Sequence, residues 1–107
     1  MNSLEDWIKK LKDSNKLIIV EGKKDKKALE DLGLLKIITI SNSSLLILDD
    51  FNEKEVIILT DLDHQGKKLY SKLRHILQRR GVKIDNQFRE FLFRNTRISH
   101  IEGIKII

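Results

Sequence analysis

Three carboxylates in this sequence directly follow short aliphatic runs, at the positions where the active sites of open α/β sheets are usually found. The two motifs are Glu21-Gly22 after residues 17–20, and Asp61-Leu62-Asp63-His64-Gln65-Gly66 after residues 56–60. An aliphatic run that ends at a turn signal is typical of a buried strand in a parallel sheet, and ligands bind beyond the carboxyl ends of such strands. We therefore expect Glu21, Asp61 and Asp63 to lie together at one sheet edge.

Carboxylates held close together repel one another and resist ionisation unless a cation neutralises them. The chain has no cysteine, so a thiolate site is excluded and oxygen ligands are expected. The sequence therefore predicts a divalent cation shared by Glu21, Asp61 and Asp63 directly or through its water shell.

Basic residues are concentrated in the segment from His64 to His100. The whole chain has a net charge of +5, but this segment has ten basic residues against two acids, a net of +8. The basic residues are Lys67, Lys68, Lys72, Arg74, Arg79, Arg80, Lys83, Arg89, Arg94 and Arg97. A charge run alone is more typical of a solvated helix face. Beside a carboxylate cluster, it favours a metal-dependent enzyme that acts on a polyanion.

Length and composition predict one domain over residues 1–107, in the cytoplasm and without a membrane segment. The chain is long enough for one modest core, and its lack of cysteine suits a reducing compartment. Its apolar stretches are too short to span a bilayer, and residues 1–16 lack the apolar centre of a signal peptide.

Hydrophobic periodicity predicts strands that alternate with helices, hence an α/β sandwich with a mostly parallel sheet of about four strands. Gly33 and Gly81 are expected to end two of the helices. The expected helices are 3–13, 24–32, a short one from Ser43 or Ser44 to 50, 66–80 and 86–94; the expected strands are 17–21, 37–40, 56–60 and 82–84, before a strand or turn over 98–107.

The two motifs, in this order and about forty residues apart, resemble those of the Toprim domain. They are Val20-Glu21-Gly22-Lys23-Lys24-Asp25 and Asp61-Leu62-Asp63-His64-Gln65-Gly66. The resemblance covers about residues 16–85, preceded by an amphipathic helix and followed by a C-terminal extension. With the closing residues 101–104, the whole chain is similar to small stand-alone Toprim proteins found mainly in archaea. It implies a compact Rossmann-like three-layer sandwich.

The resemblance also implies roles for individual residues. Glu21 matches the glutamate assigned to general acid or base work on the sugar hydroxyl, and Asp61 and Asp63 match the magnesium ligands. The residues expected to contact phosphate or nucleic acid are Gly22, Lys23, Lys24, His64, Gly66, Lys67 and Lys68. The two glycines lack side chains and so would let a phosphate approach the backbone. His64 departs from the arginine of type IA topoisomerases, and either a phosphate contact or a helix cap would explain it.

Several other residues have plainer explanations. Tyr70 is expected to be a helix-face aromatic, Trp7 a core residue, and His75 and His100 ordinary surface residues. Glu102 could be a fourth carboxylate of the site, but a C-terminal turn is the favoured interpretation.

The function favoured by this reasoning is a magnesium-dependent nuclease that hydrolyses phosphodiester bonds in RNA or DNA during processing or repair. The alternative is a non-catalytic nucleic-acid-binding or adaptor module that keeps the metal site and acts with a partner protein. A haloacid-dehalogenase phosphatase is disfavoured because Gln65 occupies the position where that class needs threonine or valine. A phospho-receiver domain is disfavoured because it has no use for Asp63. The sequence leaves the choice between RNA and DNA open, and also the oligomeric state.

Overall fold

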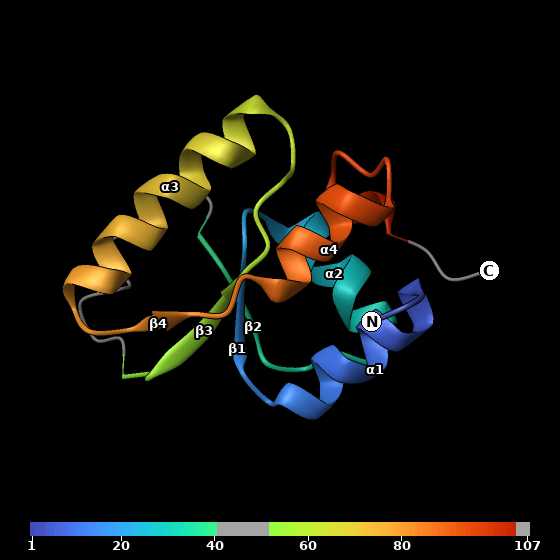
Figure 1. Cartoon of the computed structure of the whole chain (residues 1–107), viewed down its shortest axis with the longest axis horizontal. Coiled ribbons are helices and arrows are strands. Elements are labelled where there is room, and N and C mark those ends of the chain that lie inside the picture. Colours follow the sequence, from blue (N-terminus) through green and yellow to red (C-terminus); the bar gives the residue numbers. More distant parts are fainter. Residues whose placement is uncertain (41–51, 105–107) are drawn as a thin grey trace.

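A four-stranded parallel sheet forms the centre of the molecule (Figure 1). The computed structural model describes residues 1–40 and 52–104. In these residues the strands are β1 (Leu17–Val20), β2 (Ile37–Thr39), β3 (Glu55–Ile58) and β4 (Lys83–Ile84), in the order β2-β1-β3-β4. β1 and β3 are direct neighbours, with Ile18 opposite Ile57. Their carboxyl ends, which carry the candidate acids, therefore lie side by side.

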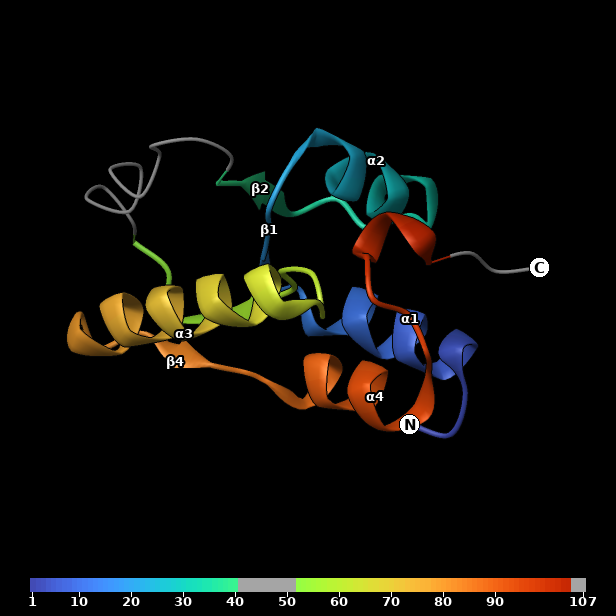
Figure 2. The same cartoon turned by 90° about the horizontal axis from the view of Figure 1, so that it is seen from above.

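Helices cover both faces of this sheet, so the predicted three-layer α/β sandwich is confirmed. They are α1 (Leu4–Ser14), α2 (Lys23–Asp31), α3 (His64–Arg79) and α4 (Gln87–Asn95), followed by a 3-10 turn, η2 (Ile101–Gly103). In Figures 1 and 2, α3 lies apart from the group that α1, α2 and α4 form.

Each sheet face has its own apolar core because successive strand residues point to opposite faces. Ile18 packs with the α1, α2, α4 group, and Ile19 packs with α3. Trp7 is fully buried in the first core, as predicted, and its indole Nε1 donates a hydrogen bond of 2.9 Å to the Phe88 carbonyl. Ile101 and Ile104 join the same core. Residues 101–104 are therefore held against the domain.

The helix boundaries largely follow the predicted signals. Gly33 and Gly81 have φ angles of 92° and 81°, a conformation that favours glycine, and each follows the end of a helix as expected. The start of α3 differs from the prediction, since the helix begins at His64 rather than Gly66. The reason is that Asp63 is the N-cap, and its Oδ1 accepts a 2.8 Å hydrogen bond from Gly66 N.

The end of β3, the C-terminal segment and the segment before residue 50 were each predicted from the sequence. β3 ends at Ile58, two residues earlier than expected, although the chain remains buried through Thr60. In the described part of the C-terminal segment, the predicted strand or turn is the 3-10 turn η2. The predicted short helix up to residue 50 lies outside the described residues. None of the helices in the described ranges is both long and apolar enough to cross a membrane.

Candidate functional site

The loop between β3 and α3 is fixed at the carboxyl edge of the sheet. Glu21 Oε1 accepts a 2.9 Å hydrogen bond from Asp61 N, which joins the ends of β1 and β3. Thr60 Oγ1 donates to the Gly66 carbonyl at 2.8 Å, across the loop. The structure thus brings Glu21 and the Asp61–Asp63 pair to one edge, as expected from their positions after neighbouring strands.

Gly66 is required by packing. A Cβ atom at this position would collide with the Asp61 carbonyl, so only glycine lets α3 start this close to the loop. Gly66 is also buried, and its N–H is already bonded to Asp63. This close approach accounts for the glycine without any contact to phosphate.

Gly22 is different, because the fold does not require a glycine there. Its φ of −145° is open to any residue, and a Cβ atom would meet Asp25 Oδ2 at 3.9 Å, an ordinary contact. Gly22 N donates a 3.1 Å hydrogen bond to the same oxygen at the start of α2. The missing side chain therefore leaves open space beside Glu21.

The buried side chain of Arg89 supports the loop between β3 and α3. It is only 2% exposed, whereas the other nine basic residues of the 64–100 segment are exposed. Its guanidinium donates to the carbonyls of Thr60 and Asp61 and lies 4.5 Å from the ring centre of Tyr70. Tyr70 is thus a helix-face aromatic, as predicted. Burial lowers the pKa of Arg89 from its usual value.

The C-terminal segment returns to the same loop, which the sequence did not reveal. Ile101 N donates a 2.8 Å hydrogen bond to Asp61 Oδ1, and Leu62 N donates one of the same length to the Ser99 carbonyl. His100 Nε2 lies 3.6 Å from Asp63 Oδ2. The side chain of His100 is exposed, as predicted for a surface residue, and it also lies beside Asp63.

Asp61, Asp63 and His100 form a group with the composition of a metal site. One ligand atom from each of the three lies within 4.8 Å of the others. Two carboxylates and an imidazole suit a divalent cation, so this donor set fits the metal that the sequence predicts. Glu21, which the sequence also predicts as a ligand, is not a member of this group, although its Oε1 bonds to the Asp61 backbone beside it.

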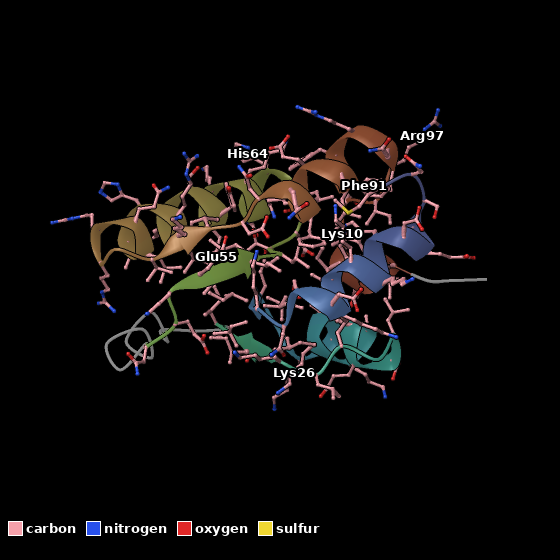
Figure 3. The ribbon with its side chains drawn as sticks, turned by 60° about the horizontal axis from the view of Figure 1, so that its bottom comes forward. Lys10, Lys26, Glu55, His64, Phe91 and Arg97 are labelled. Carbon is pink, nitrogen blue, oxygen red and sulfur yellow. The ribbon has the colours of Figure 1, made fainter. Side chains whose placement is uncertain are left out.

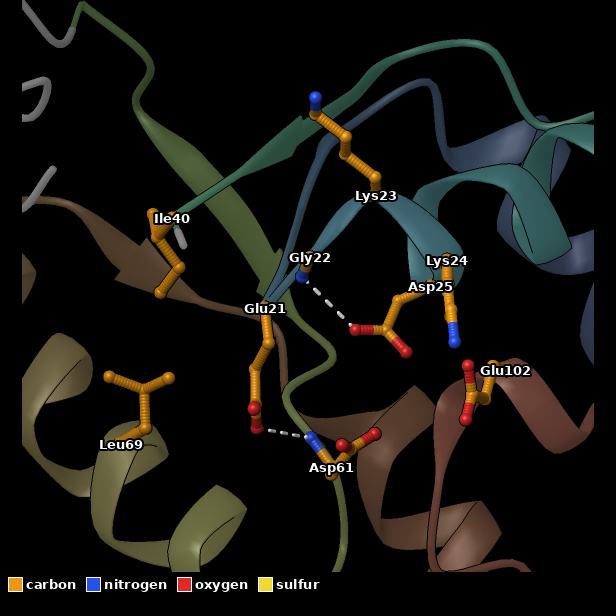
Figure 4. Close-up of a pocket in the computed structure, with 9 residues that line it drawn as sticks. All are labelled: Glu21, Gly22, Lys23, Lys24, Asp25, Ile40, Asp61, Leu69 and Glu102. Atoms are coloured by element: carbon orange, nitrogen blue, oxygen red, sulfur yellow. Dashed lines mark hydrogen bonds between the residues drawn. The ribbon is translucent and has the colours of Figure 1, made fainter. Parts of the chain in front are cut away.

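An open cleft of about 700 Å³ lies next to this group (Figure 4). Its walls are Glu21, Gly22, Lys23, Lys24, Asp25, Ile40, Asp61, Leu69 and Glu102. Glu102 belongs to η2, which confirms the favoured turn interpretation, and it also lines the cleft. The cleft is lined by four acids and two lysines. The acids would bind a cation and the lysines a phosphate, so the lining suits a phosphate group bound together with a cation.

Two carboxylates of the cleft, Glu21 and Asp25, are held in an environment that disfavours negative charge. Burial raises the pKa of Glu21, and the nearby charges of Asp61, Asp25 and Asp63 raise it further against the hydrogen bond from Asp61 N. Burial likewise raises the pKa of Asp25, with help from the charge of Asp61. A cation bound by Asp61 and Asp63 would reverse part of this effect.

The predicted phosphate-binding residues fall into two groups. Lys23 and Lys24 line the cleft, whereas His64, Lys67 and Lys68 are exposed on the first turns of α3, outside the cleft walls. Asp63, rather than His64, caps that helix. Figure 3 shows His64 and Lys26 of α2 on opposite sides of the molecule.

Comparisons with known proteins agree with this architecture. The sequence model of the Toprim domain matches residues 15–86, so the chain belongs to the Toprim domain family. This membership indicates a metal-binding role related to nucleic acids.

Within that family the chain is a member of the UPF0292 proteins, of which archaeal examples are similar to it. One from Methanocaldococcus jannaschii is 36% identical over 89% of this chain and 80% of its own length. One from Pyrococcus abyssi is 41% identical over 82% and 69%. A solved structure of a protein from Aquifex aeolicus has a TM-score of 0.87 and 35% identity, and covers 97% of this chain and 100% of its own.

Proposed function

We propose that the protein is a divalent-metal-dependent phosphodiester hydrolase that acts on RNA or DNA in processing or repair. The observation that supports this most directly is the 2.9 Å hydrogen bond between Glu21 Oε1 and Asp61 N. It holds a partly buried acid beside two candidate metal ligands, at the wall of a cleft that contains lysines. Phosphodiester hydrolysis needs a cation, a proton-transfer group and positive charge for the phosphate.

Asp61 and Asp63 are the proposed ligands of a Mg²⁺ or Mn²⁺ ion. Their loop is held by Arg89 and by the cap of α3, so both side chains are oriented before any ligand arrives. The bound cation would offset negative charge on a phosphate oxygen during the reaction.

Glu21 is the proposed general acid or base. Its Oε1 is bonded to Asp61 N, which leaves Oε2 to accept or return a proton at an attacking or leaving oxygen. Because burial raises its pKa, this carboxyl changes protonation state closer to neutral pH than an exposed glutamate does. The nearby Gly22 leaves room for the substrate to reach it.

Lys23 and Lys24 are the proposed phosphate contacts within the cleft. Both are exposed at the start of α2, where the partial positive charge of the helix end also favours an anion. His64, Lys67 and Lys68 are proposed to contact the nucleic acid strand farther from the scissile bond. Gly66 is proposed to have a structural role only, since it lets α3 start close to the loop.

The test is a cleavage assay of the purified protein on labelled single- and double-stranded RNA and DNA, with Mg²⁺ or Mn²⁺. The wild type and Asp31→Asn should cleave at least one substrate, and Asp61→Asn should cleave none. Asp31 is a matched control, because it is an exposed acid at the far end of α2. If the wild type binds nucleic acid tightly but never cleaves it with either metal, the hydrolase assignment is wrong and the adaptor alternative stands.

A further inference from the structure

We propose that His100 is a third protein ligand of the cation at Asp61 and Asp63, and that it biases this site toward first-row transition metals such as Mn²⁺ and Co²⁺ over Mg²⁺. The inference rests on the metal site of the proposed function and adds a nitrogen donor to it. That donor comes from the C-terminal segment, beyond residues 15–86 that the Toprim model matches.

The positions of the donor atoms support this proposal. Asp61, Asp63 and His100 each offer one atom within 4.8 Å of the other two, and His100 Nε2 is 3.6 Å from Asp63 Oδ2. Ligands at ~2.1 Å in an octahedral shell lie roughly 3 Å from their neighbours. A small inward movement of these three side chains, of which His100 is exposed, is therefore enough to bring the donors onto one ion.

Each of these side chains is also oriented by a hydrogen bond through its other polar atom. The pairs are Asp61 Oδ1 with Ile101 N, Asp63 Oδ1 with Gly66 N, and His100 Nδ1 with Ser99 Oγ, each 2.8 Å long. This leaves the second oxygen of each aspartate and Nε2 of the histidine for a cation. Ligands of protein metal sites are usually oriented in this way by an outer shell of hydrogen bonds.

The segment that carries His100 is anchored on both sides. The Ser99 carbonyl accepts a hydrogen bond from Leu62 N, within the loop itself, and Ile101 is fully buried in the core. An exposed histidine–aspartate pair on its own could be incidental. Here the same short segment also bonds to Asp61 through Ile101 N, so the fold holds His100 against both aspartates at once.

A nitrogen donor has a predictable effect on metal preference. Imidazole binds transition metals well, whereas Mg²⁺ prefers oxygen ligands and retains its waters. Replacing His100 should therefore weaken Mn²⁺ and Co²⁺ binding much more than Mg²⁺ binding. His75 is a matched control, because it is an exposed histidine on α3 and lies outside the metal group.

The experiment measures metal binding without nucleic acid, by calorimetry with Mn²⁺ and Mg²⁺ and by the visible spectrum of bound Co²⁺. We expect His100→Ala to lower Mn²⁺ affinity by at least about tenfold, since loss of an outer-shell partner alone typically costs ~10–100-fold, and to change the Co²⁺ spectrum. Mg²⁺ affinity should change by less than about threefold, and His75→Ala should match the wild type. Circular dichroism checks that each variant is folded.

Two further results would overturn different parts of the argument. If His100→Ala binds all three metals as the wild type does while Asp61→Asn loses them, the metal site stands and the role of His100 is wrong. If Asp61→Asn binds metals as the wild type does, or the wild type binds none, the proposed metal site itself fails. Asparagine can still accept the hydrogen bond from Ile101 N, so this variant should retain the local structure.

Discussion

The carboxylates at the two ends of the β1–β3 strand pair differ in whether a lysine is paired with them. At the amino end, Lys16 Nζ lies 2.6 Å from Asp85 Oδ2 and 3.4 Å from Glu55 Oε1. At the carboxyl end, no lysine or arginine among residues 1–40 and 52–104 lies within ion-pair distance of Glu21 or Asp25. One end is neutralised within the fold, and the other keeps its negative charge.

The pKa directions follow this difference. Burial raises the pKa of Asp85, but hydrogen bonds from Lys16 and Gln87 outweigh it, so the net shift is downward. The hydrogen bond to Asp85 in turn raises the pKa of Lys16. Glu21 and Asp25, with no such partner, have raised pKa values. The contrast indicates that the carboxyl end is built to receive a cation from outside.

Arg89 is the buried cation of the carboxyl end, yet it does not neutralise these acids by direct pairing. It donates its hydrogen bonds to the Thr60 and Asp61 carbonyls. It therefore orients the backbone of the loop and leaves the carboxylates available. The predictions below test this contrast between the two ends.

The largest expected effect concerns Glu21. Glu21→Gln should lower the cleavage rate by about 10²–10⁴-fold, because general acid–base catalysis typically contributes that much. It should leave metal affinity largely intact, since Glu21 is outside the Asp61, Asp63, His100 group. Rate assays at saturating Mn²⁺ and metal titrations measure the two properties separately. A variant that cleaves as fast as the wild type would remove Glu21 from the chemistry.

The next effect is on stability and tests the support of the loop. Arg89→Met should destabilise the fold by about 2–4 kcal/mol, because the Thr60 and Asp61 carbonyls would each lose a hydrogen-bond donor in the interior of the protein. Urea unfolding followed by circular dichroism measures this loss. Arg94→Met is the control, since Arg94 is an exposed arginine on the same helix whose contact with Glu90 is long, at 3.8 Å. Equal losses for the two variants would contradict the loop-supporting role.

Local patterns were sufficient to predict the parts of the site that follow strands. Glu21 and Asp61 end adjacent aliphatic runs, and parallel strands place such positions at one edge. The burial of Asp25 and Arg89 could also have been predicted from the sequence, because each interrupts the apolar stripe of its helix. Asp25 is three and four residues before Ala28 and Leu29, and Arg89 stands between buried phenylalanines. Such a charge on an inward face indicates a buried partner.

The contribution of His100 and Glu102 could not be predicted in this way. Their positions depend on how residues 98–104 pack against the loop, and that path is set by burial of Ile101 and Ile104 in the core that α1, α2 and α4 form. Hydrophobic periodicity describes contacts along one element, so it does not place a short turn against a loop about forty residues away.

A smaller effect compares two aspartates at opposite ends of the sheet, the partly buried Asp85 and the buried Asp25. Asp85→Asn should destabilise the protein at pH 7 by roughly 1.5–3 kcal/mol, because a hydrogen bond to a charged group is lost. The folded-state pKa of Asp85 is lowered, so its contribution is present above the unfolded value of about 3.8 and is lost as pH falls below it. Asp85→Asn should therefore lose less stability in acid than the wild type does.

Asp25→Asn should behave in the opposite way. Its folded-state pKa is raised, so its contribution to stability is present below pH 3.8 and is lost as pH rises through the folded value. In metal-free protein this variant should be no less stable than the wild type at pH 7. Unfolding curves from pH 3 to pH 8 test both variants. The same pH dependence for both would contradict the contrast between the two ends.

The smallest expected effect separates a cleft lysine from a solvated one on the same helix. Lys24 lines the cleft, whereas Lys27 is exposed, with its Nζ 3.9 Å from Asp31 Oδ1. If wild-type binding neutralises about three phosphates, its log-log salt slope is roughly −2 to −3. Lys24→Gln should reduce the slope by about 1 and weaken binding to every sequence alike, and Lys27→Gln should leave the slope unchanged. Titrations of labelled nucleic acid at several salt concentrations measure these slopes. Equal changes for the two variants would mean that net charge, rather than the cleft, attracts the phosphates.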